Sequence, residues 1–180
     1  MFTDVQGRKD QYDIDAVVKA GLFSGTSENN FEPDAPMTRA MFVTVLGRFA
    51  NAKEPAIKRF DDVPIEAWYA PYVAWGVRFG IMKGTGDSLF SPDKAVSRQE
   101  MAVLVDRYLT FRGIKLPPDA QVKQEFCDVK QIAPWAQASV TRLQLFELIE
   151  YGENLYYRPE DAATRAEVAV LFARLLEFVK

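Results

Sequence analysis

The segment FEPDAPMTR at residues 31–39 returns as FSPDKAVSR at 90–98 and as YRPEDAATR at 157–165. In each copy an aromatic residue precedes a proline by two positions and an arginine by eight, and a hydroxyl residue stands directly before the arginine. The arginines fall at positions 39, 98 and 165, so successive copies are 59 and 67 residues apart. A period of this length indicates a tandem repeat of one supersecondary unit.

A second motif opens each copy, as FTDV at 2–5, FDDV at 60–63 and FCDV at 126–129. Apolar residues recur at helical spacing between the two motifs, and a longer apolar run follows each arginine. No segment alternates as a strand does. We therefore predict an all-α fold of three helix-loop-helix repeats at 1–54, 55–120 and 121–180. A lone hairpin buries little surface, so the copies should pack with approximate threefold symmetry.

The composition excludes several classes of protein. The 180 residues are 48% hydrophobic and 26% charged, which is ordinary for a globular chain. No apolar run approaches the roughly 18 residues of a membrane span. Without histidine, the usual catalytic triads and most zinc sites are excluded, and a net charge of −3 does not attract nucleic acid. We expect no cofactor, no metal, and no nucleic-acid or membrane partner.

Catalysis has little support in the sequence. Cys127 occupies a variable column of the second motif and has no repeated basic neighbour, so it is predicted to be a filler. Gly84-Thr85-Gly86 is no phosphate loop, because no strand precedes it. A pair of carboxylates for glycoside cleavage would have to come from acidic residues that form no repeated arrangement, namely Asp61, Asp62, Glu147, Glu150 and Glu153. We predict that the chain is not an enzyme.

These motifs resemble the S-layer homology domain, which normally occurs as three tandem copies at one end of bacterial cell-surface proteins. The resemblance runs from Phe2 to about Phe178. It rests on the FxDV openings, on the glycine-containing loops at 21–25 and 80–84, and on the three hydroxyl-arginine helix starts. The TRAE segment at 164–167 matches the family's signature tetrapeptide in full.

The resemblance implies a three-pronged helical spindle with grooves between neighbouring repeats. It also implies a non-covalent anchor at the extracellular face of the bacterial cell wall or S-layer. The implied ligand is an acidic secondary cell-wall polysaccharide, in many members one with pyruvate ketals on N-acetylmannosamine. Carried over by column, the binding residues are Arg39, Arg98 and Arg165 together with Gly25, Thr26, Gly84 and Thr85.

The position of the arginines suits an anionic ligand. Thr38, Ser97 and Thr164 are predicted helix N-caps, and Glu100 and Glu167 should complete capping boxes. Each arginine then stands at the first helical position, near unpaired amides and the positive end of the helix dipole. A carboxylate there can accept two bonds from the guanidinium and a further one from an amide. The alternative is a structural role for these arginines, either in a surface ion pair or through packing of the aliphatic part of the side chain.

Other candidates surround the arginines. Gly25 and Gly84 are predicted to end the first helix in the left-handed conformation and to let a sugar approach the backbone. Trp68 and Trp135 are placed to cover a pyranose face, although an aromatic at the start of an amphipathic helix is more often a core residue. Three further arginines lie nine residues after the first set, about half a turn away, and are predicted to face elsewhere: Arg48, Arg107 and Arg174.

The copies are unequal. Lys9 stands where the other repeats have tryptophan, and Met41 replaces the capping-box glutamate. In the third loop, Glu147 and Tyr151 stand where the others have glycine. The second repeat is therefore predicted to contribute the most to binding. The sequence does not decide whether the site that uses the third loop binds a ligand.

The sequence leaves two hypotheses about function open, and it suggests how the chain is derived from a longer protein. The first reading is the polysaccharide anchor, and the alternative is a self-assembling or protein-binding S-layer scaffold that contacts peptidoglycan. Met1 leads straight into the first repeat without the charged and apolar segments of a signal peptide. We expect an anchor processed or excised from a longer exported protein.

Overall fold

The computed structural model describes residues 2–116, 121–149 and 155–178. The helices in this part are α1 (Gln11–Lys19), α2 (Arg39–Phe49), α3 (Ala70–Arg78), α4 (Arg98–Phe111), α5 (Pro134–Leu145) and α6 (Arg165–Phe178), with 3-10 turns at Thr3–Val5 and Val129–Gln131. Extended pairing among these residues is limited to isolated bridges. The prediction of an all-α fold is confirmed, and none of the described helices is long and apolar enough to cross a bilayer.

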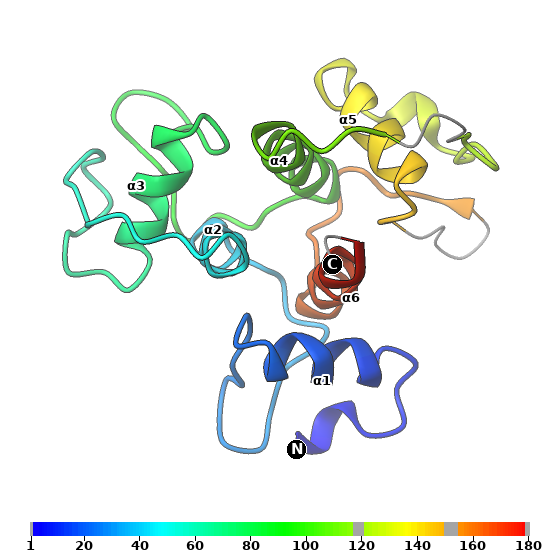
Figure 1. Ribbon diagram of the computed structural model, residues 1–180, viewed down its shortest axis with the longest axis horizontal. Helices are drawn as coiled ribbons and strands as arrows, with labels where there is room; N and C mark the ends of the chain where they lie inside the picture. Colours follow the sequence, from blue (N-terminus) through cyan, green and yellow to red (C-terminus); the bar gives the residue numbers. More distant parts are fainter. Residues whose placement is uncertain (1, 117–120, 150–154, 179–180) are drawn as a thin grey trace.

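The helices are arranged as a centre with three arms. Helices α2, α4 and α6 stand at the centre, and α1, α3 and α5 lie around them (Figure 1). Each outer helix packs on the central helix of the preceding repeat, so α3 packs on α2, α5 on α4 and α1 on α6. Each arm is therefore shared by two repeats, and the contact of α1 with α6 joins the two ends of the chain.

A ring of backbone hydrogen bonds links the three repeats where the central helices begin. The amide of Met37 donates to Ala163 O at 2.8 Å, that of Ala163 to Val96 O at 2.9 Å, and that of Val96 to Met37 O at 2.9 Å. All three residues are buried. Because each residue both donates and accepts, the ring closes only when all three repeats are in place.

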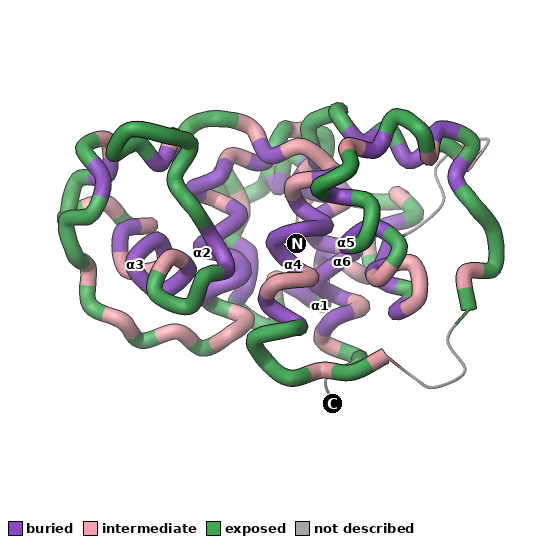
Figure 2. Tube along the Cα trace, turned by 90° about the horizontal axis from the view of Figure 1, so that it is seen from above, coloured by how far each residue is buried: buried purple, intermediate pink, exposed green. Residues whose placement is uncertain are grey.

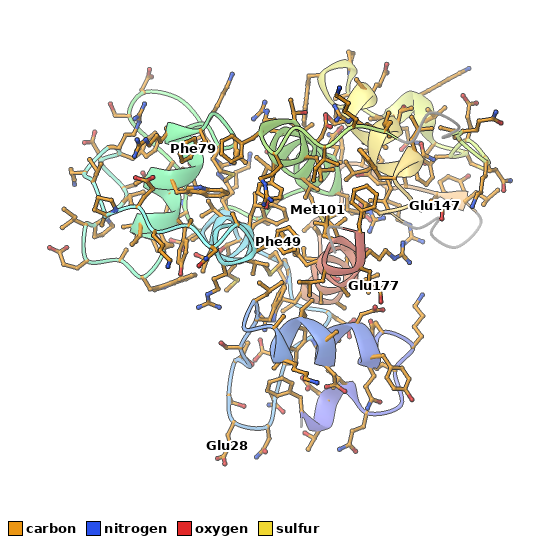
Figure 3. All side chains as sticks on the ribbon, viewed as in Figure 1. Glu28, Phe49, Phe79, Met101, Glu147 and Glu177 are labelled. Atoms are coloured by element: carbon orange, nitrogen blue, oxygen red, sulfur yellow. The ribbon has the colours of Figure 1, made fainter. Side chains whose placement is uncertain are left out.

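Aromatic side chains fill the space between the central helices. Phe49 of α2 contacts both Phe172 of α6 and Tyr108 of α4, with ring centroids 5.5 and 5.6 Å apart. Buried residues follow the helices while exposed residues concentrate in the connecting loops (Figure 2). Figure 3 shows Phe49 and Met101 near the centre and Glu28 at the tip of an arm. The core thus belongs to the three repeats together.

The predicted N-caps are present. Ser97 Oγ accepts from the amide of Glu100 at 3.3 Å, and the Glu100 carboxylate accepts from the amide of Ser97 at 2.9 Å. Thr164 and Glu167 form the same capping box. Thr38 accepts from the amide of Met41 at 3.3 Å, without a returning carboxylate. The caps fix the position of each first helical residue, which is the arginine.

Candidate functional site

Three hollows of similar size lie between the repeats, and each is built from all three of them. Groove 1, of about 330 Å³, contains Arg165, the loop 22–26, α2 and Trp68. Groove 2, of about 340 Å³, contains Arg39, the loop 83–85, α4 and Trp135. Groove 3, of about 330 Å³, contains Arg98, residues 148–149, α6 and Lys9. The arginine therefore comes from one repeat, the loop and long helix from the next, and the tryptophan column from the remaining one.

This partition divides the second repeat between two grooves. Gly84 and Thr85 share groove 2 with Arg39 of the first repeat, whereas Arg98 lies in groove 3. A ranking of repeats therefore does not translate into a ranking of grooves, because no groove is made by one repeat alone.

In groove 1 the guanidinium of Arg165 is held by the loop that it faces. Its Nε donates to Phe31 O at 2.7 Å and its Nη2 to Ser24 O at 2.9 Å. The guanidinium carbon lies 4.5 Å from the centroid of the Phe31 ring. Among the described residues Nη1 has no hydrogen-bond partner, so two N–H groups remain available in the groove.

Arg39 repeats this arrangement in groove 2. Its Nε donates to Phe90 O at 2.8 Å, its Nη2 donates to Lys83 O at 2.7 Å, and its guanidinium lies 4.7 Å from the Phe90 ring centroid. Arg39 and Arg165 are 6% and 7% exposed. Burial lowers the pKa of both guanidinium groups, because desolvation disfavours the charged form. Both are desolvated cations whose hydrogen bonds go to carbonyl groups.

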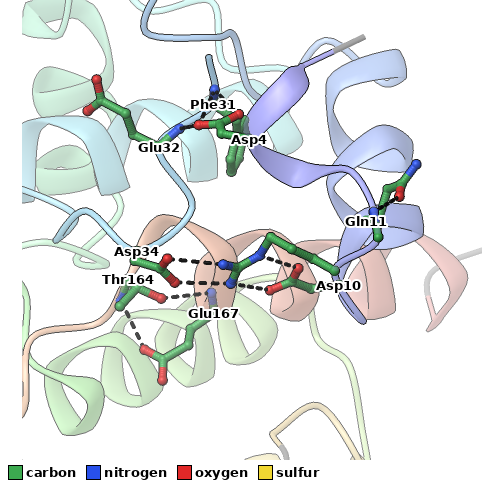
Figure 4. A network of polar contacts seen from close by, with 10 residues as sticks. Asp4, Asp10, Gln11, Phe31, Glu32, Asp34, Thr164 and Glu167 are labelled. Atoms are coloured by element: carbon green, nitrogen blue, oxygen red, sulfur yellow. Dashed lines mark hydrogen bonds and ion pairs between the residues drawn. The ribbon is translucent and has the colours of Figure 1, made fainter. Parts of the chain in front are cut away.

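Groove 3 differs because its arginine is paired with a carboxylate. Arg98 Nε donates to Tyr157 O at 2.6 Å, but its Nη1 forms an ion pair with Glu167. In the same groove the Arg8 guanidinium is bound by Asp10 at 2.9 Å and Asp34 at 3.0 Å, as the dashed lines to these carboxylates show in Figure 4. Both arginines in the described lining of groove 3 are therefore already paired with carboxylates of the protein.

The charges of the lining residues separate the grooves further. The described lining of groove 3 has three basic and three acidic side chains, which balance. Groove 2 has four basic residues and one carboxylate, Glu100. Groove 1 has Arg165 and Arg48 and, in its described lining, no carboxylate, because Met41 stands in the glutamate column. Two of the substitutions that weaken the repeat pattern, Met41 and Lys9, thus lie in different grooves.

The residues that hold each guanidinium were not recognised from the sequence. Asp62 accepts from the amides of Phe90 and Ser91 at 2.8 and 2.7 Å, and Ser91 has a left-handed φ of 57°. The bent backbone turns the Phe90 carbonyl toward Arg39. The other repeats have the same arrangement, in which an aspartate accepts from two successive amides and the second residue has a left-handed φ. Asp4 accepts from Phe31 and Glu32, and Asp128 accepts from Tyr157 and Arg158. The aspartate and aromatic columns were the available signal, since both repeat three times.

The predicted left-handed conformation of Gly25 and Gly84 is wrong. The left-handed residues after the first helices are Gly21, with φ 73°, and Gly80, with φ 70°. A Cβ on Gly25 would lie 2.3 Å from Phe2 Cε1, and one on Gly84 would lie 2.7 Å from Leu89 O. The missing side chains make room for the protein's own atoms, although both glycines line their grooves. Tyr151, in the same column, lies outside the described residues.

The two tryptophans do not lie in the core. Trp68 and Trp135 are each 58% exposed, and they line grooves 1 and 2. The interpretation of these side chains as core residues is therefore wrong. Thr26 and Thr85 lie in the same two grooves, where Thr85 Oγ1 is 2.7 Å from Ser91 Oγ.

Each arginine of the second set lines a different hollow from its partner nine residues earlier, as predicted, but two of these hollows are grooves 1 and 2. Arg48 lines groove 1 and donates to Leu22 O at 3.0 Å, and Arg107 lines groove 2 and donates to Ile81 O at 3.3 Å. Arg48 does point away from Arg39 on α2, but the groove on that side receives Arg165 from the third repeat. Arg174 instead lines a separate cavity of about 710 Å³.

The helix amides are not free for a ligand. The amides of Arg39 and Ala40 donate to Lys94 O and Pro92 O, both at 2.9 Å. The first two amides of α4 and of α6 are used in the same way by the loop of another repeat. The expected third bond from a helix amide is therefore wrong, because packing between repeats consumes these donors. In the described part of the chain no group of three or more acidic or cysteine side chains is placed to hold a metal ion.

Comparison with known proteins supports the repeat assignment. The family model for the S-layer homology domain matches residues 2–41, 59–102 and 125–169. The chain is 28% identical over 170 residues to the surface-layer 125 kDa protein of Lysinibacillus sphaericus, covering 92% of this chain and 14% of that protein. It is 31% identical over 147 residues to the cellulosome-anchoring protein of Acetivibrio thermocellus, covering 78% and 31%.

An enzyme also contains a matching region. The chain is 27% identical over 183 residues to the amylopullulanase of Thermoanaerobacterium thermosulfurigenes, covering 98% of this chain but 9% of that enzyme. The chain thus spans less than a third of the length of each of these curated relatives. With three matches in tandem that coincide with the three repeats, the chain belongs to the S-layer homology domain family.

Proposed function

We propose that the chain is a non-covalent anchor that binds an acidic, pyruvylated secondary cell-wall polysaccharide in grooves 1 and 2. Family membership indicates a location at the bacterial cell wall or S-layer. The observation that carries the proposal is the state of Arg165 and Arg39. Each is almost fully buried, is bonded to carbonyl groups, and keeps Nη1 without a partner among the described residues.

A sugar carboxylate compensates this charge. The Nη1 group donates to the carboxylate, while the bonds from Nε and Nη2 hold the guanidinium in place before the ligand arrives. A charge-assisted bond of this kind contributes about 1.5–3 kcal/mol. Because the arginine is already ordered, little side-chain entropy is lost on binding.

The remaining lining suits the rest of a pyruvylated sugar. A pyruvate ketal carries a methyl group beside its carboxylate, and groove 1 offers the apolar side chains of Met37, Met41 and Val45 near Arg165. Trp68 and Trp135 present exposed indole rings for the apolar face of the pyranose. The hydroxyls of Thr26 and Thr85 can pair with sugar hydroxyls or with an N-acetyl group.

The grooves act together on a polymer. When two sites on one body bind the same chain of sugars, the second event becomes intramolecular, and avidity exceeds either affinity by roughly 10²–10⁴. A modest affinity per sugar therefore suffices for retention at the wall. In this proposal the chain has no catalytic role, and the amylopullulanase match concerns a small part of that enzyme.

The test is a binding assay on purified cell-wall sacculi. We expect the chain to bind intact sacculi and to lose binding after chemical removal of the secondary polymer or of its pyruvate. Calorimetric titration with a pyruvylated N-acetylmannosamine glycoside should give a measurable affinity. Undiminished binding to stripped sacculi would reject the proposal in favour of a scaffold that contacts peptidoglycan or protein.

A further inference from the structure

Groove 2 does not end at Trp135. A second hollow of about 340 Å³, here called the outer hollow, lies against Trp135 and also includes Gln99, Glu160 and Ala162. It shares Lys94, Glu100 and Trp135 with groove 2. The two hollows are therefore neighbours, and the exposed indole of Trp135 lines both of them.

We propose that the outer hollow is a second sugar subsite, which takes the neutral sugar adjoining the acidic sugar of groove 2. This inference rests on the proposed function, because it assumes a saccharide on Arg39. It makes the ligand of groove 2 a disaccharide unit of the polymer, with Trp135 against both of its rings.

Groove 2 and the outer hollow differ in the charges of their lining residues. Groove 2 has four basic side chains and one carboxylate, whereas the outer hollow has Lys94 with two carboxylates, Glu100 and Glu160. A second acidic sugar beside Glu160 would meet like charge. Hydroxyl and acetamido N–H groups donate to carboxylates, so a neutral N-acetylated sugar fits this chemistry. The acidic sugar consequently belongs on the Arg39 side.

Gln99, which lines the outer hollow, connects α4 to α5. The side-chain Oε1 of Gln99 accepts from the amide of Ala133 at 3.0 Å, and Gln99 is 6% exposed. This bond ties the beginning of α5 to the beginning of α4, and Trp135 is the second residue of α5. In the other repeats the Gln99 column holds Ala40 and Ala166, whose side chains offer no acceptor. Among the three repeats this connecting acceptor is therefore specific to the second.

The experiment compares a monosaccharide with disaccharides on the Arg165→Ala variant, in which groove 2 is left intact. The probes are a pyruvylated N-acetylmannosamine glycoside and the same sugar extended by N-acetylglucosamine on either side. We expect one disaccharide to bind about tenfold more tightly than the monosaccharide, as a gain of ~1.4 kcal/mol gives. If the monosaccharide binds and neither disaccharide binds more tightly, the second subsite is rejected but the proposed function is not.

Two variants locate the gain. Ala162→Trp fills the outer hollow, and Glu160→Ala removes an exposed acceptor without touching the core. Both variants should leave the affinity for the monosaccharide unchanged. The tighter binding of the disaccharide should be abolished by Ala162→Trp and reduced severalfold by Glu160→Ala. A full advantage retained in both variants overturns the inference. Absence of any binding by the monosaccharide and disaccharides rejects the proposed binding function of groove 2 as well.

Discussion

Arg165 and Phe31 are separated by 134 residues, yet Nε of Arg165 donates to Phe31 O at 2.7 Å and its guanidinium lies 4.5 Å from the Phe31 ring centroid. The contact joins the last helix to the first loop and helps to close the circle of repeats. One side chain thus has two functions, because Nε and Nη2 hold the loop and Nη1 is left for a ligand. Arg39 has the same relationship with Phe90.

Arg165→Ala and Arg39→Ala should each reduce affinity for a pyruvylated monosaccharide in the affected groove by about 10- to 150-fold, as the loss of 1.5–3 kcal/mol implies. Arg98→Ala is the matched control, since it removes the same contact to an aromatic carbonyl but from the self-neutralised groove 3. It should change binding less than about twofold, because it leaves the arginines of grooves 1 and 2 in place. Calorimetry on the three variants checks this, and equal losses in all three would contradict the assignment of the grooves.

The two grooves should respond differently to salt. Arg165→Ala leaves groove 2, with four basic side chains in its lining, and Arg39→Ala leaves groove 1, with two. Screening shortens the Debye length from about 10 Å at 0.1 M to 3 Å at 1 M, which weakens the exposed charges most. The affinity of the Arg165→Ala variant should therefore fall more steeply between these concentrations. Parallel titrations measure the two slopes, and identical slopes would count against a role for Lys83 and Lys94.

Acid should weaken the hydrogen bonds by which the Asp4 carboxylate holds the loop of groove 1 at Phe31 and Glu32. Desolvation raises the pKa of Asp4, but hydrogen bonds from the amides of Phe31 and Glu32 outweigh it and leave the pKa below its ordinary value of 3.8. A lowered folded-state pKa means that this stabilisation is present above that ordinary value and is lost as the pH falls through the folded-state pKa. Asp4→Asn should lower the unfolding midpoint at neutral pH and flatten its decline below about pH 4. Thermal unfolding from pH 7 to pH 2 measures both, and an unchanged acid decline would exclude Asp4 as a contributor.

The loop ends offer a test of backbone conformation. Gly80 has a φ of 70°, and apart from its two chain neighbours no residue has an atom within 4 Å of the place that a Cβ would take. Gly80→Ala should therefore lower the free energy of unfolding by about 1–2 kcal/mol through backbone conformation alone. Glu147 occupies the same column with a φ of 55°, and Glu147→Gly should stabilise by about 1 kcal/mol. Chemical denaturation gives both values. Glu147→Ala is the control, because it removes the ion pair with Lys123 without relieving the backbone.

Much of the fold could be predicted because the repeat is dense in local signals. The hydroxyl-arginine helix starts and the capping glutamates Glu100 and Glu167 depend on contacts within four residues, and the structure has them where the sequence predicts them. The tryptophans were misjudged because an aromatic on an amphipathic helix gives the same pattern whether it meets the core or a groove. Only its 58% exposure distinguishes the two cases.

The sequence alone determined that the chain has three copies of one helical unit and that an arginine begins the second helix of each, because these features arise from periodicity and local capping. The tertiary structure decided which arginine meets which loop, since each groove assembles segments from three repeats across long separations. It also decided which arginine stays without a carboxylate. That outcome depends on which residue, Met41, Glu100 or Glu167, occupies the third position of the facing helix. It also depends on whether a carboxylate there reaches the incoming guanidinium, as it does only for Arg98 among the described ion pairs.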